Sequence, residues 1–175
     1  MWPAMSMRPG TNMINRRFQR VFAWVFLFGV VLPAMAAPRP APDFKLSGMD
    51  GKPVELKAYR GKLVILNFWA TWCPPCLQEV PDLVDFYQQH GEDAVVIGLA
   101  VDDDAKEIKE FIRVMDVTYP VAISTDAINK KYGGILSLPI TFFIDRKGRI
   151  VTQQVGIVTR KQLEQFVSTG KVTIH

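Results

Sequence analysis

The chain has few of the side chains that metal centres require. In 175 residues it contains two cysteines, Cys73 and Cys76, and two histidines, His90 and His175. A tetrahedral zinc site needs four ligands, and the histidines lie far along the sequence from the cysteine pair and from each other. A zinc centre is therefore not expected, and no other metal site is predicted. No cysteine is available at the N-terminus to carry a lipid.

The chain has no excess of positive or negative charge once the N-terminal segment is set aside. The formal net charge is +4, and four arginines before position 37, with no acidic residue among them, account for it. The rest of the chain has equal numbers of basic and acidic side chains. Such a balance gives no reason to expect a nucleic-acid partner. Length and composition fit one globular domain with its own core.

No apolar run is long enough to span a membrane. Residues 21–32 form a run of twelve, whereas a spanning helix needs roughly 20 residues. The run follows the arginines and precedes small residues at 34–36 that suit a signal peptidase. We therefore expect residues 1–36 to be a cleaved signal peptide, with a retained signal anchor as the alternative. Either Met1 or Met13 can serve as the start.

The remaining chain divides into two expected parts. Residues 37–43 are rich in proline and are expected to form an extended linker without a core. Residues 44–175 are expected to form one domain. The signal segment places that domain in the periplasm or on the extracytoplasmic side of the cytoplasmic membrane.

Apolar periodicity predicts an α/β domain. Residues 63–69 and 94–100 are almost wholly apolar, as is typical of central strands covered on both faces. Helical patterns follow both, and a strand–turn–strand unit precedes a last helix with a capping box at Thr159 and Gln162. The order β-α-β-α-β-β-α predicts a mixed central sheet with helices on both faces and an N-terminal β extension at residues 44–56. The first helix is expected to bury Leu77, Val80, Val84 and Tyr87.

A Trp-Cys-Pro-Pro-Cys stretch, residues 72–76, connects the first central strand to its helix. Two cysteines at this spacing and place indicate a reversible dithiol and disulfide. Unpaired N–H groups and the helix dipole favour a thiolate at Cys73, which is therefore the expected nucleophile. Cys76, one turn further on and more buried, is expected to resolve the mixed disulfide. A static disulfide is the weaker interpretation, because a bridge around so few residues gains little loop-closure entropy.

Residues beside the cysteines are expected to shape substrate binding. Pro74 and Pro75 fix the turn into the helix and withhold N–H groups from the sulfurs. Trp72 is expected to flank the sulfurs as an apolar contact surface, whereas Trp69 suits the core better. No cofactor is expected beyond the redox-active disulfide itself.

The chain also resembles a known family. Residues 61–76, Gly-Lys-Leu-Val-Ile-Leu-Asn-Phe-Trp-Ala-Thr-Trp-Cys-Pro-Pro-Cys, and residues 138–145, Leu-Pro-Ile-Thr-Phe-Phe-Ile-Asp, carry the resemblance. Both stretches are similar to signatures of extracytoplasmic, thioredoxin-like thiol-disulfide oxidoreductases of the TlpA/ResA type. This group of the AhpC/TSA–redoxin superfamily includes the cytochrome c maturation reductases. The resemblance runs from about residue 44 to residue 166, most of the chain after the expected signal peptide, and implies a thioredoxin fold.

The resemblance implies roles for further residues. Glu79 stands where the family has a glutamate that adjusts the cysteine pKa values and transfers protons. From the sequence alone, an ordinary surface acid is the alternative. Pro139 is expected to follow a cis peptide bond and to hold the Leu138 backbone beside Cys73, where a substrate strand can pair with it. Asn67 replaces a buried aspartate of cytosolic thioredoxins.

The expected activity is reduction of disulfides in envelope proteins, apocytochrome c among them, by a monomer. By family analogy, a membrane thiol electron donor regenerates the dithiol. Two alternatives stay open, namely a disulfide-forming oxidant and a copper-handling binding protein of the same fold. The lack of an inserted helical domain argues against the oxidant. The Cys-x-x-Cys spacing, one residue shorter than the Cys-x-x-x-Cys of copper-handling modules, argues against the binding protein.

Overall fold

The structure is a computed structural model that describes residues 38–101 and 104–174. The expected signal peptide lies outside the described residues, so its assignment stays a prediction. Within the described part of the chain, none of the helices combines the length and the hydrophobicity needed to cross a membrane.

The described elements follow the predicted order, with short strands that the sequence patterns did not predict. In chain order the elements are β1 (Arg39–Pro40), β2 (Lys45–Ser47), β3 (Pro53–Glu55), the 3₁₀ helix η2 (Leu56–Tyr59), β4 (Leu63–Trp69), α2 (Pro74–His90), β5 (Ala94–Ala100), α3 (Ala105–Val114), β6 (Val121–Ile123), α4 (Asp126–Lys131), β7 (Ile140–Ile144), β8 (Arg149–Val155) and α5 (Arg160–Thr169).

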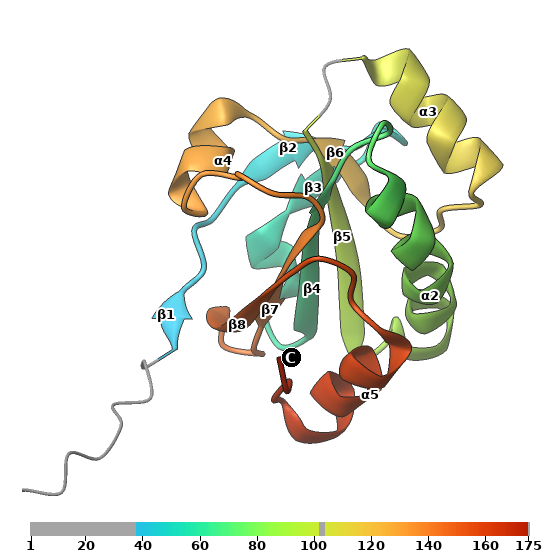
Figure 1. The fold of residues 1–175 in the computed structure, drawn as a ribbon. Helices are drawn as coiled ribbons and strands as arrows, with labels where there is room; N and C mark the ends of the chain where they lie inside the picture. The colour runs from blue at the N-terminus through green and yellow to red at the C-terminus, as the bar shows by residue number, and fades with distance from the viewer. Residues whose placement is uncertain (1–37, 102–103, 175) are drawn as a thin grey trace, which may run out of the picture. The chain divides into compact units, whose positions relative to one another are not determined.

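Six strands form one mixed sheet in the order β1-β8-β7-β4-β5-β6 (Figure 1). Strands β4, β5 and β6 run parallel to one another. Strand β7 is antiparallel to β4, and the β7–β8 hairpin completes that side of the sheet. The β2–β3 hairpin is the predicted N-terminal extension, and a bridge between Gly48 and Ala122 connects it to β6. The predicted mixed sheet is therefore confirmed.

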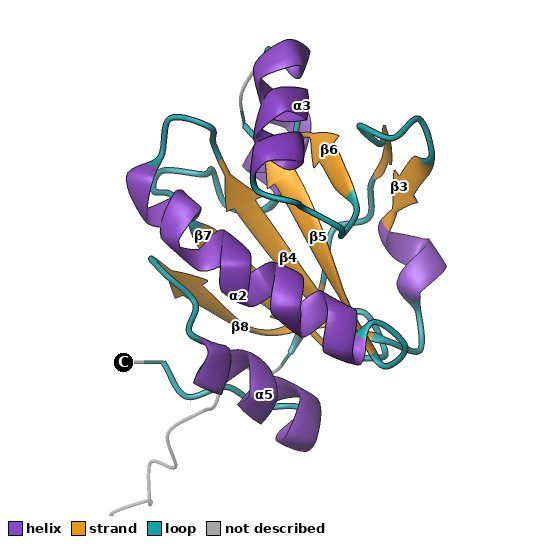
Figure 2. Cartoon of the chain, turned by 90° about the vertical axis from the view of Figure 1, so that its right-hand side faces the viewer, coloured by secondary structure: helices purple, strands orange, loops and turns teal. Residues whose placement is uncertain are grey.

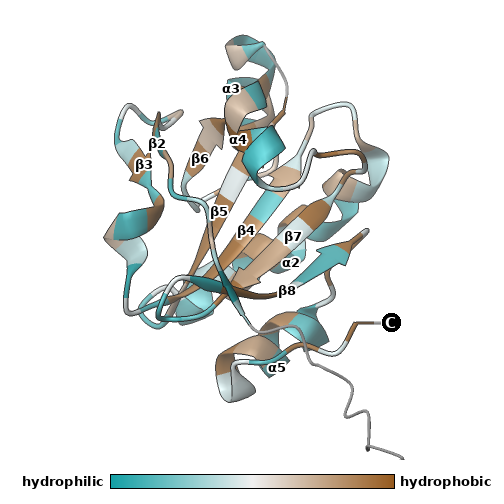
Figure 3. Ribbon diagram, turned by 90° about the vertical axis from the view of Figure 1, so that its left-hand side faces the viewer, coloured by the Kyte–Doolittle hydropathy of each residue, from teal (hydrophilic) through white to brown (hydrophobic). Residues whose placement is uncertain are grey.

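Both faces of the sheet are covered, which explains why β4 and β5 are apolar throughout. Successive side chains of a strand point to opposite faces. Ile65 and Trp69 pack with residues of α2, α3 and α5, the helices that Figure 2 shows in front of the sheet. Leu66 and Phe68 pack on the other face with the β2–β3 hairpin and α4. Figure 3 shows this second face, where most of each central strand is coloured as hydrophobic and β4 has one hydrophilic band.

The proline-rich segment contacts the domain, which differs from the expected linker without a core. Strand β1 pairs with β8, and the Ala41 amide donates to the Gly148 carbonyl at 3.0 Å. Ala41 is buried, and the Tyr132 hydroxyl donates to the Pro42 carbonyl at 2.8 Å. Prolines are compatible with an edge strand, because the outer side of that strand needs no N–H donor. Two paired residues are too few to leave a periodic signal in the sequence.

Helix α2 runs through Pro81 without a break, and its buried side differs in part from the predicted one. Leu77 was expected in the core but is 38% exposed, and Tyr87 is only half-buried. Since Cys76 is fully buried, the side of the helix that faces the sheet contains the residues three, four and seven positions after it. The buried residues are Cys76, Glu79, Val80, Leu83, Val84 and Phe86.

Candidate active site

The cysteine pair lies between β4 and α2, where the sequence places it. After β4 ends, the Cys73 amide donates to the Ala70 carbonyl at 3.2 Å, and this turn places Cys73 as the N-cap of α2. Cys73 and Cys76 are joined in a disulfide, and both residues are buried. The expected difference in burial between the two cysteines is small in this oxidised form.

The two prolines of the motif occupy the first two positions of α2 and therefore offer no N–H to the sulfurs. The first backbone amide after Cys73 is that of Cys76, and it donates to the Cys73 sulfur at 3.3 Å. An N–H aimed at a sulfur and the positive end of a helix dipole both stabilise a thiolate when the bond is reduced. Pro74 and Pro75 limit the number of amides that act in this way.

Glu79 is not a surface acid, because its side chain is buried beneath α2 and only 1% of the residue is exposed. Its carboxyl group accepts hydrogen bonds from the Asn67 side-chain amide at 2.7 Å and from the Val158 backbone amide at 2.9 Å. Burial raises the pKa of Glu79 to about 7, and the hydrogen bonds from Val158 and Asn67 offset this rise only in part. The carboxyl group can therefore gain or lose a proton near neutral pH.

Asn67, Thr141 and Val158 are site residues for which the sequence analysis predicted no role. The Asn67 amide donates to both Glu79 and the Thr141 hydroxyl, the latter at 3.0 Å. These residues come from β4, β7 and the loop after β8. A signal for Asn67 was present, since it is the one polar residue in an otherwise apolar strand. Buried amides need hydrogen-bond partners, so that position alone indicated a buried polar group nearby.

An apolar cavity of about 450 Å³ opens beside the disulfide. It brings together the predicted substrate residues Trp72, Pro74, Pro75 and Leu138 with Cys73. Trp72 is 69% exposed, as a contact surface requires, and Trp69 is buried in the core as expected. The predicted cis peptide bond between Leu138 and Pro139 is present. Leu136, for which the sequence predicted no role, lines the same cavity and is 93% exposed.

This arrangement suits thiol–disulfide exchange with another protein. The backbone at Leu138, just before β7, and an apolar rim can hold an extended polypeptide beside Cys73. Glu79 lies three positions after Cys76 on α2, so the two side chains are neighbours on the helix surface. Within the described residues, no three His, Cys, Asp or Glu side chains are grouped as metal ligands would be.

Comparisons with known proteins give relatives of one kind. Residues 38–153 match the sequence model of the AhpC/TSA family. The chain is 37% identical over 134 residues to the thiol-disulfide oxidoreductase ResA of Bacillus thuringiensis subsp. konkukian, and the alignment covers 76% of this chain and 78% of that protein. It is 36% identical over 128 residues to the thioredoxin-like protein YneN of Bacillus subtilis, covering 71% of this chain and 75% of that protein.

Two solved structures are similar over most of the described domain. One is a thiol:disulfide interchange protein of the thioredoxin family from Chlorobium tepidum TLS, with a TM-score of 0.71 and 32% identity, covering 76% of this chain and 96% of that one. The other is the exposed lipoprotein thioredoxin Etrx1 of Streptococcus pneumoniae, with a TM-score of 0.65 and 30% identity, covering 73% of this chain and 98% of that one. The thioredoxin fold implied by the sequence is therefore confirmed.

Proposed function

Since this chain belongs to the AhpC/TSA family and is a thiol-disulfide oxidoreductase of the ResA type, we propose that it reduces disulfides of envelope proteins outside the cytoplasm. Apocytochrome c is the client that the family resemblance favours. The observation that carries the proposal is the combination at one helix N-terminus of a disulfide, an apolar cavity and a buried carboxyl group. The enzyme acts as a monomer and needs no cofactor besides the cysteine pair.

The reaction begins with both cysteines reduced. The Cys73 thiolate attacks one sulfur of the client disulfide, that S–S bond breaks, and the leaving sulfur of the client takes up a proton. The Cys76 thiol then loses its proton and attacks the Cys73 sulfur of the mixed disulfide. The second client sulfur leaves as a thiol, and the Cys73–Cys76 disulfide forms. Two electrons have passed from the enzyme to the client.

Glu79 serves as the proton acceptor for Cys76 in this scheme. A general base is most effective when its pKa lies near the working pH, and the pKa of Glu79 is about 7. The hydrogen bonds from Asn67 and Val158 hold the carboxyl group in place against β4 and the loop after β8. Residues three positions apart on a helix are close enough for transfer directly or through one water.

The proposed location and the proposed electron donor are inferred from the N-terminal segment and from the relatives. Residues 1–36 have the pattern of a signal peptide, and one structural neighbour is described as an exposed lipoprotein. An enzyme that transfers two electrons to each client is left with an oxidised Cys73–Cys76 pair, which must be reduced again. We therefore include a membrane thiol donor among the partners of this enzyme.

Trapping of clients tests the proposal. A Cys76→Ser variant of the full-length chain, produced in a bacterial host, cannot resolve the mixed disulfide and should accumulate covalent complexes with envelope proteins. Dithiothreitol should release them, and mass spectrometry identifies them. The matched Cys73→Ser variant lacks the nucleophile and should trap far less. Equal yields from both variants, or none from either, would contradict the assignment of Cys73.

A further inference from the structure

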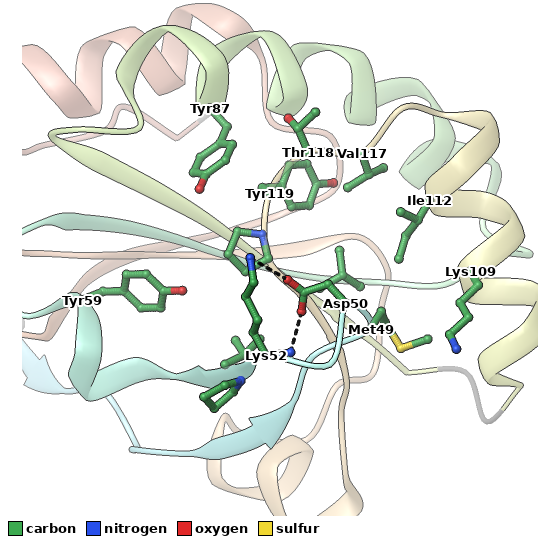
Figure 4. A pocket seen from close by; sticks show the side chains of 14 residues that line it. Met49, Asp50, Lys52, Tyr59, Tyr87, Lys109, Ile112, Val117, Thr118 and Tyr119 are labelled. Carbon is green, nitrogen blue, oxygen red and sulfur yellow. Dashed lines mark hydrogen bonds and ion pairs between the residues drawn. The ribbon is translucent and has the colours of Figure 1, made fainter.

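A second cavity, of about 410 Å³, lies between the β2–β3 hairpin and helices α2 and α3 (Figure 4). None of the residues around it lines the cavity beside the disulfide. Its volume is within the range of about 300–1,000 Å³ that is typical of small-molecule sites. Its apolar walls include Met49, Pro53, Val54, Ile112, Val117 and Val121.

Three phenol groups from separate elements surround this cavity. Tyr59 ends η2, Tyr87 lies on α2, and Tyr119 precedes β6 (Figure 4). The rings of Tyr87 and Tyr119 meet edge to face, with centroids 6.3 Å apart. Among the described residues, no side chain or backbone group forms a hydrogen bond with any of the three hydroxyls, whereas the Tyr132 hydroxyl donates to Pro42.

The unpartnered hydroxyl of Tyr119 is the strongest indication of a ligand. Tyr119 is only 4% exposed, and its side chain lines the cavity. Among the described residues, the Trp69 ring nitrogen is the one fully buried side-chain polar atom without a partner. The Tyr119 hydroxyl therefore opens to the cavity, where a ligand can accept its hydrogen bond. Burial raises the pKa of Tyr119, and also that of Tyr59, so both groups stay protonated and can donate at neutral pH.

The charged residues of the lining favour an anion. Lys52 forms an ion pair with Asp50 at 3.7 Å, drawn as a dashed line in Figure 4, so these two charges compensate each other. Lys109, on α3, pairs with no carboxylate of residues 38–101 or 104–174. The lining therefore offers phenol donors and, within residues 38–101 and 104–174, one ammonium group without a carboxylate partner, over apolar walls.

We propose that this cavity binds a small organic carboxylate. The apolar body of the ligand contacts the hydrophobic walls, and its carboxylate accepts hydrogen bonds from the phenols and pairs with Lys109. Inorganic anions would leave the apolar walls unused, and neutral aromatic molecules would not offer Lys109 a negative charge. The site is separate from the redox centre, and binding there does not require that the disulfide be reduced.

Titration of the oxidised, full-length chain tests this proposal. The probes are benzoate and octanoate, with benzyl alcohol and benzylamine as neutral and cationic comparators, followed by backbone amide NMR shifts. At least one carboxylate should saturate, with the largest shifts at residues 49–54 and 117–121. Benzyl alcohol should bind about tenfold more weakly, because it lacks the charge-assisted hydrogen bonds.

Two lysines of the same helix provide a matched pair of variants. Lys109→Met should weaken binding of the carboxylate about tenfold. Lys106→Met removes a lysine that is also exposed but does not line the cavity, and should leave binding unchanged. Tyr119→Phe should also weaken binding. Lys109 is exposed, so its replacement by methionine is not expected to disturb the fold, whereas replacing the buried Tyr119 could.

Three results would overturn the proposal. The first is failure of both carboxylates to saturate. The second is equal binding of benzoate, benzyl alcohol and benzylamine, which would show only apolar partition. The third is an equal loss of affinity in the Lys106→Met and Lys109→Met variants, which would show that the charge of the helix, rather than this cavity, attracts the anion.

Discussion

Glu79 is the residue on which the proposed proton transfer depends. Its carboxyl group is removed from water and keeps two hydrogen-bond donors, Asn67 and Val158. Burial destabilises the charged form of Glu79 more than these two hydrogen bonds stabilise it, since the pKa of Glu79 rises to about 7. The folded protein therefore favours the neutral acid, and ionisation of Glu79 costs stability.

Replacing Glu79 with glutamine should change how stability depends on pH. The pKa of Glu79 is about 7 in the folded chain and 4.5 in its ordinary state. A raised pKa stabilises the fold below pH 4.5, and that contribution is lost as pH rises through 7. The loss is about 3 kcal/mol relative to Glu79→Gln, at about 1.4 kcal/mol per pKa unit. Urea unfolding of the two oxidised proteins at about pH 4 and at about pH 8 measures this difference in unfolding free energy.

The glutamine variant carries one constant penalty, because its amide has a single acceptor oxygen and cannot accept from both the Asn67 amide and the Val158 N–H. This penalty does not vary with pH, so only the slope of the difference matters. Parallel stability curves for the two proteins would contradict a raised pKa. The same variant should slow reduction of insulin disulfides about 100-fold at neutral pH if Glu79 acts as the base.

Replacing Pro75 with alanine should make Cys73 more acidic. Pro75 occupies the second position of α2, where a backbone N–H can reach the N-cap side chain. Alanine restores that N–H, and one hydrogen bond to a thiolate lowers the pKa of Cys73 by about one unit. The rate of iodoacetamide alkylation against pH reports the change. Pro74→Ala is the control, because an N–H at the first position does not face the N-cap, and an equal shift there would refute this reasoning.

At the scale of elements, helix α5 and the loop before it hold the far side of the site. Thr159 and Gln162 form the predicted capping box, with the Gln162 side chain accepting from the Thr159 amide at 3.0 Å. Gly170 ends the helix with a φ of 67°, the left-handed conformation that favours glycine. The residue before the cap, Val158, donates to Glu79. The capped start of α5 therefore holds the Val158 amide in position to donate to Glu79.

Removing the cap should weaken the fold and disturb Glu79 together. Thr159→Ala deletes the side chain that accepts from the Gln162 amide and should cost about 1 kcal/mol of unfolding free energy. Thr159→Ser keeps the hydroxyl and should cost much less. Chemical denaturation measures both, and equal losses would show that the methyl group rather than the cap stabilises the helix.

The long elements could be predicted from sequence, and the shortest ones could not. Strands β4 and β5 each have seven buried residues, which leave a continuous apolar run. Strand β1 has two residues and β6 has three, so neither produces a period. Strands this short are defined by hydrogen bonds to a neighbouring strand far away in the sequence, which a local sequence pattern does not show.

In the molecule as a whole, the fold joins three segments of the sequence at the redox site, residues 67–79, 136–141 and 158. The cysteine pair and the cis peptide bond were predictable, because each is written in a short motif. The full burial of Glu79 was not, since it depends on Asn67, Thr141 and Val158 meeting across the sheet. Exposure of Leu136 likewise depends on the loop that follows α4.

The reduction potential of the Cys73–Cys76 couple distinguishes a reductase from an oxidant. It is measured on the purified protein by equilibration with glutathione or dithiothreitol buffers. A dedicated reductase should have a potential near or below that of thioredoxin, about −270 mV. A value near −120 mV, as found for a strong oxidant, would contradict the reductase assignment and would identify disulfide formation as the activity.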